Sequence, residues 1–324
     1  MADDLCKRAF AGYHFSGEEE NGNFLVYRLS DGTGSGEMAS FEVCEGIQLT
    51  YNRLEMDSCF QAISPSPGFM QINHCLEGCF EFELQDGSVG FAGEGDLCVH
   101  DLGGQAFAGS RFPSRKYFGL TVLLELGPAQ RSLDGLFPKA KIDLLGLRDI
   151  LCPQGQSLFI RARSEVEHIF SELYCVDDRI REPYSLIKVV EILLYLGLAD
   201  RHSCQHLPTF SPAVVKGTKE AYAYLTENPF RKTTIGELSA MFHVADSSLK
   251  RCFKAISGQT IGAFIKEKRI RAAADLLLEQ EELSIGAVAE LTGYGSQSKF
   301  SSAFKALMGQ TPLVYRSQRK TCLT

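Results

Sequence analysis

The carboxy-terminal part of the chain contains one stretch that decides its fold, and it contains that stretch twice. Residues 234–254 read TIGELSAMFHVADSSLKRCFK, and residues 284–305 read SIGAVAELTGYGSQSKFSSAFK. Each copy predicts a short helix, a tight turn and a second helix that ends in Phe-Lys. Small residues such as Ala240 and Ala289 let two helices cross closely, as a helix-turn-helix unit requires. An internal duplication indicates this arrangement more strongly than a single copy does.

The second helix of each copy, its recognition helix, is expected to contact DNA. Leu249 and Phe253 are four residues apart and should face inward, as should Phe300 and Phe304. The short polar residues that open each helix are typical of N-caps. Arg can bridge guanine and Gln can pair with adenine in the major groove. We therefore predict that base contacts come from the polar faces of the two helices, through Ser247, Lys250, Arg251, Gln297, Ser298 and Ser301.

A long helix predicted at about Ile261–Glu279 joins the two copies. At 1.5 Å per residue it is about 30 Å long, close to one turn of B-DNA, so it can hold the recognition helices in successive major grooves. Its basic residues and those of the recognition helices are predicted to contact phosphates. A solvated helix face remains the alternative for any one of them. The predicted backbone contacts are Lys254, Lys266, Lys268, Arg271, Lys299 and Lys305.

The charge of the chain is divided unevenly, and the division favours a nucleic-acid partner. The formal net charge of the 324 residues is -7, which by itself argues against DNA binding. Residues 211–324 hold 16 Lys and Arg against 10 Asp and Glu, whereas residues 1–210 hold 17 against 30. The carboxy-terminal region therefore carries +6 and the remainder -13. Such asymmetry points to a nucleic-acid-binding module joined to an acidic domain.

The amino-terminal region predicts a small antiparallel β-structure followed by helices. Between about residues 24 and 121 the sequence has many short β-prone runs, among them residues 69–73 and 79–84. Turn signals such as Asp86-Gly87 and Gly95-Asp96 separate these runs, which is typical of a barrel or jelly roll. Between about residues 157 and 200 apolar residues recur at three- and four-residue steps, which predicts two amphipathic helices. Their surplus apolar surface indicates either a partner subunit or burial within the same domain.

Residues 215–319 resemble the DNA-binding domain of the AraC/XylS family of transcription regulators. The resemblance begins in the first recognition helix, with Leu249, Arg251, Phe253 and Lys254 at the spacing of the family motif. It continues through residues 269–277, which read RIRAAADLL. It is strongest in residues 304–316, which read FKALMGQTPLVYR. The fold of this region is thereby expected to be that of the family.

The chain departs from the family pattern in both recognition helices. The serine that usually opens the first motif is Ala245 here, so that helix loses an N-cap that Asp246 or Ser247 could replace. In the second helix Lys299 and Ser302 stand where the family often has an aromatic residue and an arginine. The first helix is therefore expected to dominate specificity.

The resemblance also implies partners. The amino-terminal strands look like the cupin-type sensor barrel that many members of this family place before the DNA-binding domain. In the family such a barrel binds a small-molecule effector, and the helices after it often form a homodimer. The implied partners are double-stranded operator DNA, an effector of unknown identity, a second subunit and, for an activator, RNA polymerase.

These observations predict an α+β protein with two domains. Residues 1–205 are expected to form a cupin-like effector-sensing and dimerisation domain, an antiparallel β-barrel or jelly roll with helices at about 157–200. Residues 206–212 are expected to be a linker. Residues 213–324 are expected to form an all-α domain with two helix-turn-helix units joined by the long helix.

Histidines and cysteines on neighbouring predicted strands leave one rival function open, a cupin-type metalloenzyme or a metal or thiol sensor with a helical tail. Residues 75–79 span a predicted hairpin turn, however, and free cysteines commonly behave as small buried hydrophobes. Residues 202–206, which read HSCQH, lack a fourth ligand in a predicted linker and are interpreted as incidental. No metal or cofactor is assigned. The candidate ligands on the strands are His74, Cys75, Cys79, Cys98 and His100.

The sequence lacks the motifs of several common classes of enzyme. No nucleophile elbow, P-loop or dinucleotide fingerprint is present, so no catalytic residue is assigned and a non-enzyme is expected. An acidic start without a secretory signal, 11 cysteines and no apolar helical run of membrane-spanning length favour a cytoplasmic protein with reduced thiols and no membrane partner. Phe80, Phe82 and Phe91 could line an effector pocket but are interpreted as core. The effector-binding residues stay unassigned.

Overall fold

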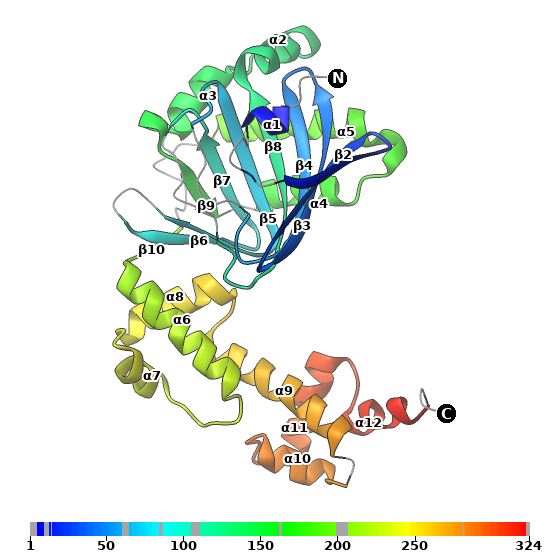
Figure 1. The fold of residues 1–324 in the computed structure, drawn as a ribbon, viewed down its shortest axis with the longest axis vertical. Coiled ribbons are helices and arrows are strands. Elements are labelled where there is room, and N and C mark those ends of the chain that lie inside the picture. Colours follow the sequence, from blue (N-terminus) through cyan, green and yellow to red (C-terminus); the bar gives the residue numbers. More distant parts are fainter. Residues whose placement is uncertain are drawn as a thin grey trace. The chain divides into compact units, whose positions relative to one another are not determined.

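The computed structural model describes residues 5–9, 13, 15–59, 65–83, 87–104, 111–161, 164–198, 207–280 and 282–321 (Figure 1). The chain divides into two compact units, Met1–Ser211 and Pro212–Thr324. The first unit is built on an antiparallel sheet with helices, and the second is helical. The predicted α+β class is therefore confirmed. Among the helices that the structure describes, none is both long and apolar enough to cross a bilayer.

The sheet of the first unit has ten strands in the order β1-β2-β3-β4-β8-β5-β6-β10, with β7 on β5 and β9 on β7. Within the described ranges no strand pairing joins the ends of this path, so the sheet is open rather than closed into a barrel. The strands are β1 (Phe15–Asn21), β2 (Phe24–Asp31), β3 (Gly34–Cys44), β4 (Ile47–Glu55), β5 (Phe69–Glu83), β6 (Val89–Gly93), β7 (Asp96–Asp101), β8 (Tyr117–Glu125), β9 (Leu158–Arg161) and β10 (Thr209–Phe210).

Strand β5 is continuous where the sequence predicted two strands and a turn. Its first part pairs with β7 and β8, and its last five residues pair with β6. The register shifts between Cys75 and Glu77, so the predicted hairpin turn is wrong and residues 75–79 contain a bulge. Gly78 has a φ of 90°, and a Cβ there would lie 1.9 Å from the carbonyl oxygen of Lys116. The bulge falls at Leu76, just before the glycine, and bends the strand without ending it, which a turn signal alone does not reveal.

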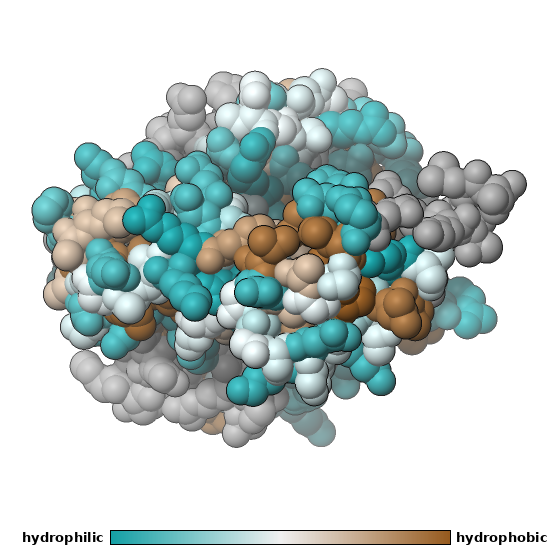
Figure 2. Space-filling view, turned by 90° about the horizontal axis from the view of Figure 1, so that it is seen from below, coloured by the Kyte–Doolittle hydropathy of each residue, from teal (hydrophilic) through white to brown (hydrophobic). Residues whose placement is uncertain are grey.

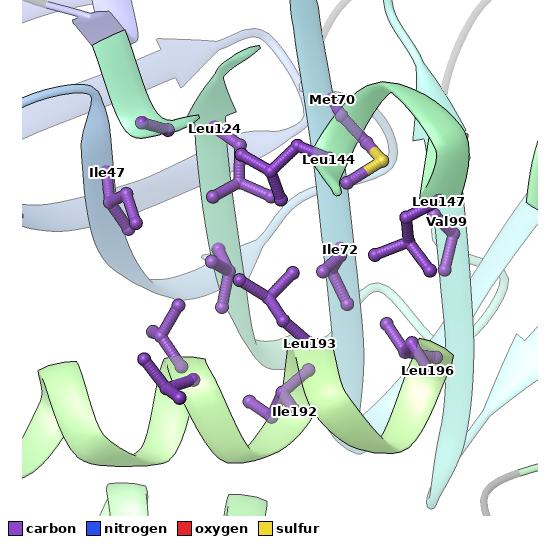
Figure 3. Close-up of a cluster of buried hydrophobic side chains, with 14 of the residues drawn as sticks. Ile47, Met70, Ile72, Val99, Leu124, Leu144, Leu147, Ile192, Leu193 and Leu196 are labelled. Carbon is purple, nitrogen blue, oxygen red and sulfur yellow. The ribbon is translucent and has the colours of Figure 1, made fainter. Parts of the chain in front are cut away.

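Helices α2 to α5 cover one face of the sheet and form the largest core with it. Ile47, Ile72 and Leu124 come from three different strands and lie with Leu193 and Leu196 of α5 in one buried cluster (Figure 3). Because successive strand residues point to opposite faces, the neighbours of these residues lie on the other face of the sheet. The helices of this unit are α1 (Leu5–Ala9), α2 (Leu126–Leu136), α3 (Leu144–Leu151), α4 (Ser164–Tyr174) and α5 (Arg181–Gly197).

The helical segment predicted at about residues 157–200 begins with a strand. Strand β9 pairs with β7, and α4 starts only after it. A short apolar run is compatible with a strand as well as a helix. Here residues 158–161 form a strand because they pair with the edge of β7. Phe170 of α4 and Leu193 of α5 are buried as the pattern predicted, whereas Ile187 and Leu194 are 55% and 43% exposed. Helices α2 and α3 were not predicted at all.

The second unit folds around helix α9, which has the bounds predicted from the sequence. The first part of α9 packs through Phe264 into one hydrophobic cluster, and its later part packs through Ile270 into another. Some apolar side chains, such as Leu291 and Leu313, stay exposed. Figure 2, seen from below Figure 1, shows apolar patches among the hydrophilic surface. The helices are α6 (Pro212–Glu227), α7 (Ile235–Phe242), α8 (Asp246–Ser257), α9 (Ile261–Glu279), α10 (Ile285–Leu291), α11 (Gln297–Met308) and α12 (Pro312–Thr321).

Candidate nucleic-acid interface

The turns of the two helix-turn-helix units have the same backbone geometry at corresponding residues. After α7, His243 has a φ of 55°, and after α10, Gly293 has a φ of 81°. A left-handed residue at this place lets the next N–H bond back to the carbonyl five residues earlier, which closes the helix as in the Schellman motif. The duplication in the sequence is therefore also a duplication of the turn. The closing bonds run from Val244 N to Ser239 O (3.2 Å) and from Tyr294 N to Ala289 O (2.9 Å).

Helix α8 separates a buried face from a polar face as the sequence predicted. Leu249 and Phe253 are fully buried in the first cluster of this unit. The predicted base-contact residues on α8 are exposed, and so is the lysine near its end. This arrangement leaves the polar face of α8 open over at least two turns. The exposed residues are Ser247, Lys250, Arg251 and Lys254.

The start of α8 lacks a side-chain cap. Ala245 occupies the N-cap position with an extended backbone, and no side chain accepts a hydrogen bond there. Asp246 and Ser247 are already inside the first turn, so the expected replacement of the cap by either residue is wrong. The first recognition helix therefore depends on packing more than on capping for its stability.

Helix α11 has the cap that α8 lacks. Ser296 at the N-cap accepts a hydrogen bond from the backbone N–H of Lys299 at 3.3 Å. Phe300 and Phe304 are fully buried, as predicted. The side chains on the opposite face are small and polar, apart from two lysines. Gln297, Ser298, Lys299, Ser302 and Lys305 are exposed, and Ser301 is half-buried.

The predicted phosphate contacts on α9 differ in their surroundings. Lys266 is exposed. Lys268 is half-buried, and its Nζ lies 5.2 Å from the centre of the Phe264 ring on the same helix. Arg271 donates from Nε to Glu267 at 2.7 Å. Hydrogen bonds, first from Gln259 and then from Arg271, hold the pKa of the Glu267 carboxyl below its usual range. Lys266 is thus the α9 cation most open to a phosphate.

Arg269, which the sequence places among the basic residues of α9, has a structural role. Its Nε donates to the carbonyl oxygen of Pro229 at 2.9 Å, and its Nη2 donates to that of Arg231 at 3.2 Å. Both carbonyls belong to the loop between α6 and α7. The guanidinium therefore holds this loop against α9. Nothing in the residue pattern distinguishes Arg269 from its exposed neighbours.

The first unit contains a cavity on the sheet face opposite α4 and α5. Its volume is about 60 Å³, and it is open to solvent on one side. Phe80 borders this cavity, whereas Phe82 and Phe91 are buried core residues. The polar part of the lining was not predicted from the sequence, although polar residues alternate with apolar ones along β5. These polar lining residues include Asn52, Gln71, Asn73 and Thr121.

The histidines and cysteines considered as metal ligands do not all lie on one face of the sheet. His74 is stacked on Phe170 of α4 with ring centres 4.3 Å apart, on the helix-covered face of the sheet. Cys75, Cys98 and His100 border the cavity on the opposite face. In the part of the chain that the structure describes, no three His, Cys, Asp or Glu side chains are grouped as metal ligands. Residues 202–206 lie outside the described residues.

Comparison with known proteins identifies the second unit. Residues 238–318 match a family model described as a helix-turn-helix domain. Over 93 residues, 29% of its length, the chain is 33% identical to a probable transcriptional regulator, LumQ, of Photobacterium leiognathi. Over 138 residues, 42% of its length, it is 33% identical to a putative AraC-like transcription regulator of Streptomyces lividans. The chain spans only 37% and 44% of the length of these two curated relatives.

A solved structure is also similar to part of the chain. The carboxy-terminal domain of AraT, a response regulator from Geobacillus stearothermophilus, is 31% identical and matches 33% of this chain and 86% of that domain, with a TM-score of 0.29. The matched family model covers the two duplicated turns. The resemblance seen in the sequence is confirmed: the second unit of this chain is a helix-turn-helix domain of the kind found in AraC-like transcription regulators.

Proposed function

We propose that this chain is a sequence-specific transcription regulator whose second unit binds double-stranded DNA. The observation that carries the proposal is the repeated turn, which presents two recognition helices, each with its aromatic face buried and its polar face exposed. Helix α9 joins them with 19 residues, about 30 Å at 1.5 Å per residue. Two helices at such a separation suit successive major grooves of one duplex.

Within this proposal the residues of the two helices have different roles. Arg251 presents a planar group that can bridge guanine O6 and N7, and Gln297 can pair with adenine. Ser247, Lys250, Ser298 and Ser301 complete the base-contact set. The weaker recognition chemistry of α11, with its small serines, supports α8 as the main source of specificity. The phosphate contacts are assigned to Lys254, Lys266, Lys268, Arg271, Lys299 and Lys305.

The first unit is proposed to sense a small molecule. Its cavity supports this role, because small-molecule sites are concave and largely apolar with a few placed polar groups. We assign residues 1–205 to this cupin-like sensing and dimerisation domain, residues 206–212 to the linker and residues 213–324 to DNA binding. We propose that the chain has two conformations that present the DNA-binding unit differently. Bound effector can shift the equilibrium between them only to the extent that its affinity for the two conformations differs.

A homodimer is proposed through α5. Ile187 and Leu194 are seven residues apart on this helix, and both are exposed although they are large and apolar. Their replacement by Lys is expected to leave a monomer, whereas Lys at the exposed Leu136 of α2 serves as the matched control. Sedimentation velocity measures the mass. Equal masses for both variants would contradict this interface.

The regulator is proposed to act in the cytoplasm without a cofactor or an enzymatic activity, and to contact RNA polymerase if it activates transcription. The metalloenzyme alternative has no support in the described residues, because His74 lies on the other face of the sheet from His100.

Selection from a random pool of DNA duplexes tests the proposed function. The full-length protein is expected to enrich a shared sequence, and a variant with Ala at Arg251, Lys254 and Gln297 is expected to enrich none. These three side chains are exposed, so their loss should leave the fold intact. Wild-type protein that retains duplexes without sequence preference, or retains none, would exclude a sequence-specific regulator.

A further inference from the structure

A row of polar side chains crosses the cavity face of the sheet. Ser40 of β3 pairs with Thr50 of β4, Thr50 pairs with Thr121 of β8, Thr121 pairs with Asn73 of β5, and Asn73 pairs with Cys98 of β7. All five residues therefore stand side by side on one face across five neighbouring strands. The opposite face holds the main apolar core. Burying polar side chains costs free energy, so apolar packing alone does not explain this row.

Hydrogen bonds fix the direction of each amide in the middle of the row. The Thr121 hydroxyl donates to Asn73 Oδ1 at 2.6 Å and accepts from Asn52 Nδ2 at 2.9 Å. Gln71 Nε2 donates to the same Asn73 oxygen at 2.8 Å. Since one oxygen accepts both bonds, the Nδ2 group of Asn73 must point the other way. The four side chains form one connected network at the wall of the cavity.

The network leaves three polar groups unused. Asn52 Oδ1, Asn73 Nδ2 and Gln71 Oε1 have no hydrogen-bond partner in the described part of the chain, and all three residues line the cavity. Asn52 is 95% buried, with an exposed fraction of 5%. These groups open onto the cavity, where water or a ligand can pair with them. The wall therefore offers two acceptors and one NH2 donor.

The rest of the described lining is aromatic or apolar and carries no charge. Phe80, Phe112 and Tyr117 form one aromatic group, with ring centres 5.3 to 6.4 Å apart. No Lys, Arg, Asp or Glu belongs to the lining that the structure describes. Burial lowers the pKa of His100 to about 3, so this lining histidine is neutral near pH 7. Burial likewise raises the pKa of the Cys75 and Cys98 thiols, which stay protonated.

We infer that this cavity binds an uncharged, flat molecule that carries both hydrogen-bond donors and an acceptor along one edge. The polar edge pairs with Asn52, Gln71 and Asn73, and the apolar body lies against the rings of Phe80 and Phe112. The inference deepens the effector role proposed above and rests on it for any effect on DNA binding. A carboxylate or an ammonium group would lose its hydration here without gaining a counter-charge.

A binding screen with matched fragments tests this assignment on the full-length protein. The probes are flat fragments in neutral, anionic and cationic forms, such as benzamide, benzoate and benzamidine, with affinities from ligand-observed NMR titrations. Where a set of three related fragments shows binding, its neutral fragment is expected to bind at least about tenfold more tightly than either charged fragment. Charged members that bind equally well, or a complete absence of binding by the neutral members, would overturn the inference.

Two isosteric variants place the binding at the amide network. Asn73→Asp puts a negative charge where the free NH2 donor stands, so it is expected to abolish binding of neutral fragments and to admit benzamidine. Gln71→Glu is the second variant, in case the first does not fold. Asn21→Asp makes the same chemical change on the exposed end of β1, where the affinity should stay unchanged. Equal effects at Asn73 and Asn21 would contradict the assignment.

The screen separates this inference from the proposed function. Protein that selects no DNA sequence but binds neutral fragments refutes the regulator and leaves the cavity chemistry standing. Protein that selects a DNA sequence and prefers charged fragments refutes the cavity chemistry alone.

Discussion

The guanidinium of Arg269 donates from Nε to the carbonyl oxygen of Pro229 at 2.9 Å, and this bond ties the central helix of the second unit to the loop before α7. A second bond runs from Nη2 to the carbonyl of Arg231. A Cβ built on Gly293 would lie 3.7 Å from Nη1, so the same side chain also borders the turn of the second helix-turn-helix unit. Arg269 thus contacts the loop before the first helix-turn-helix unit and lies beside the turn of the second helix-turn-helix unit.

Loss of Arg269 is expected to loosen the loop at residues 229–231. Hydrogen bonds from a charged group are worth about 1.5–3 kcal/mol each, so Arg269→Ala should lower the local opening free energy by about 2 kcal/mol or more. This corresponds to about thirtyfold faster hydrogen exchange, most clearly at the amides of Asn228 and Arg231. Arg271→Ala is the matched control, because it removes an exposed pair with Glu267. Equal exchange in the two variants would contradict the role of Arg269.

Arg251 is expected to contribute base recognition rather than charge alone. Arg251→Ala should weaken binding to the selected duplex by about 1–3 kcal/mol and relax one base preference. Arg251→Lys keeps the charge but loses the planar fork, so it should not restore that preference. Affinity for the selected duplex and for single-base variants of it checks the assignment. Full rescue by Lys would make Arg251 a phosphate contact instead.

Lys266 is expected to contact phosphate. Lys266→Ala should weaken binding to all duplexes alike and reduce the slope of log affinity against log salt by about 0.9, the value for one phosphate contact. Lys268→Ala is expected to change the slope less, because this side chain is half-buried against Phe264. Titrations over a range of salt concentrations measure both. A wild-type slope for Lys266→Ala would remove this residue from the interface.

His74 is expected to make the first unit sensitive to acid. Burial lowers its pKa from 6.5 to about 4, so the unfolded chain takes up a proton at a higher pH than the folded chain does. Stability is therefore constant above about pH 6.5 and falls as the pH drops toward 4, by up to about 3 kcal/mol from this residue. His74→Gln should flatten the decline, and part of it should remain because the pKa of His100 is lowered too.

Denaturant unfolding at several pH values checks this prediction. The wild-type protein, unfolded under the same conditions, is the reference. The slope matters rather than the absolute stability, because Gln also loses the stacking of His74 on Phe170. An unchanged slope in His74→Gln would show that this histidine does not titrate differently in the folded state.

The second unit could be predicted from its sequence because its signals are local. The spacing of Leu249, Phe253, Phe300 and Phe304 defines the buried faces of α8 and α11, and all four are fully buried. The missing cap at Ala245 was visible, but its consequence depended on where the helix begins. Arg269 could not be told from the exposed basic residues of α9, because its partners are backbone carbonyls about forty positions away.

The first unit was harder to predict because long-range pairing decides its structure. Residues 75–79 contain a turn-like glycine, yet a bulge at Leu76 lets β5 continue through Gly78 against β8. The hydrogen-bond network of the cavity could not be predicted, because Asn52, Asn73 and Thr121 are far apart in the chain and are brought together only by the register of the strands. Register cannot be derived from alternation along single strands alone.

The most direct test of the account is a hydroxyl-radical footprint of the full-length protein on a selected duplex. Two recognition helices held by α9 should protect two segments on one face of the DNA, about 10 base pairs apart from centre to centre. Substitutions on α8 should remove protection of one segment first, and those on α11 that of the other. A single protected segment, or two segments on opposite faces of the duplex, would contradict tandem recognition by the two helix-turn-helix units.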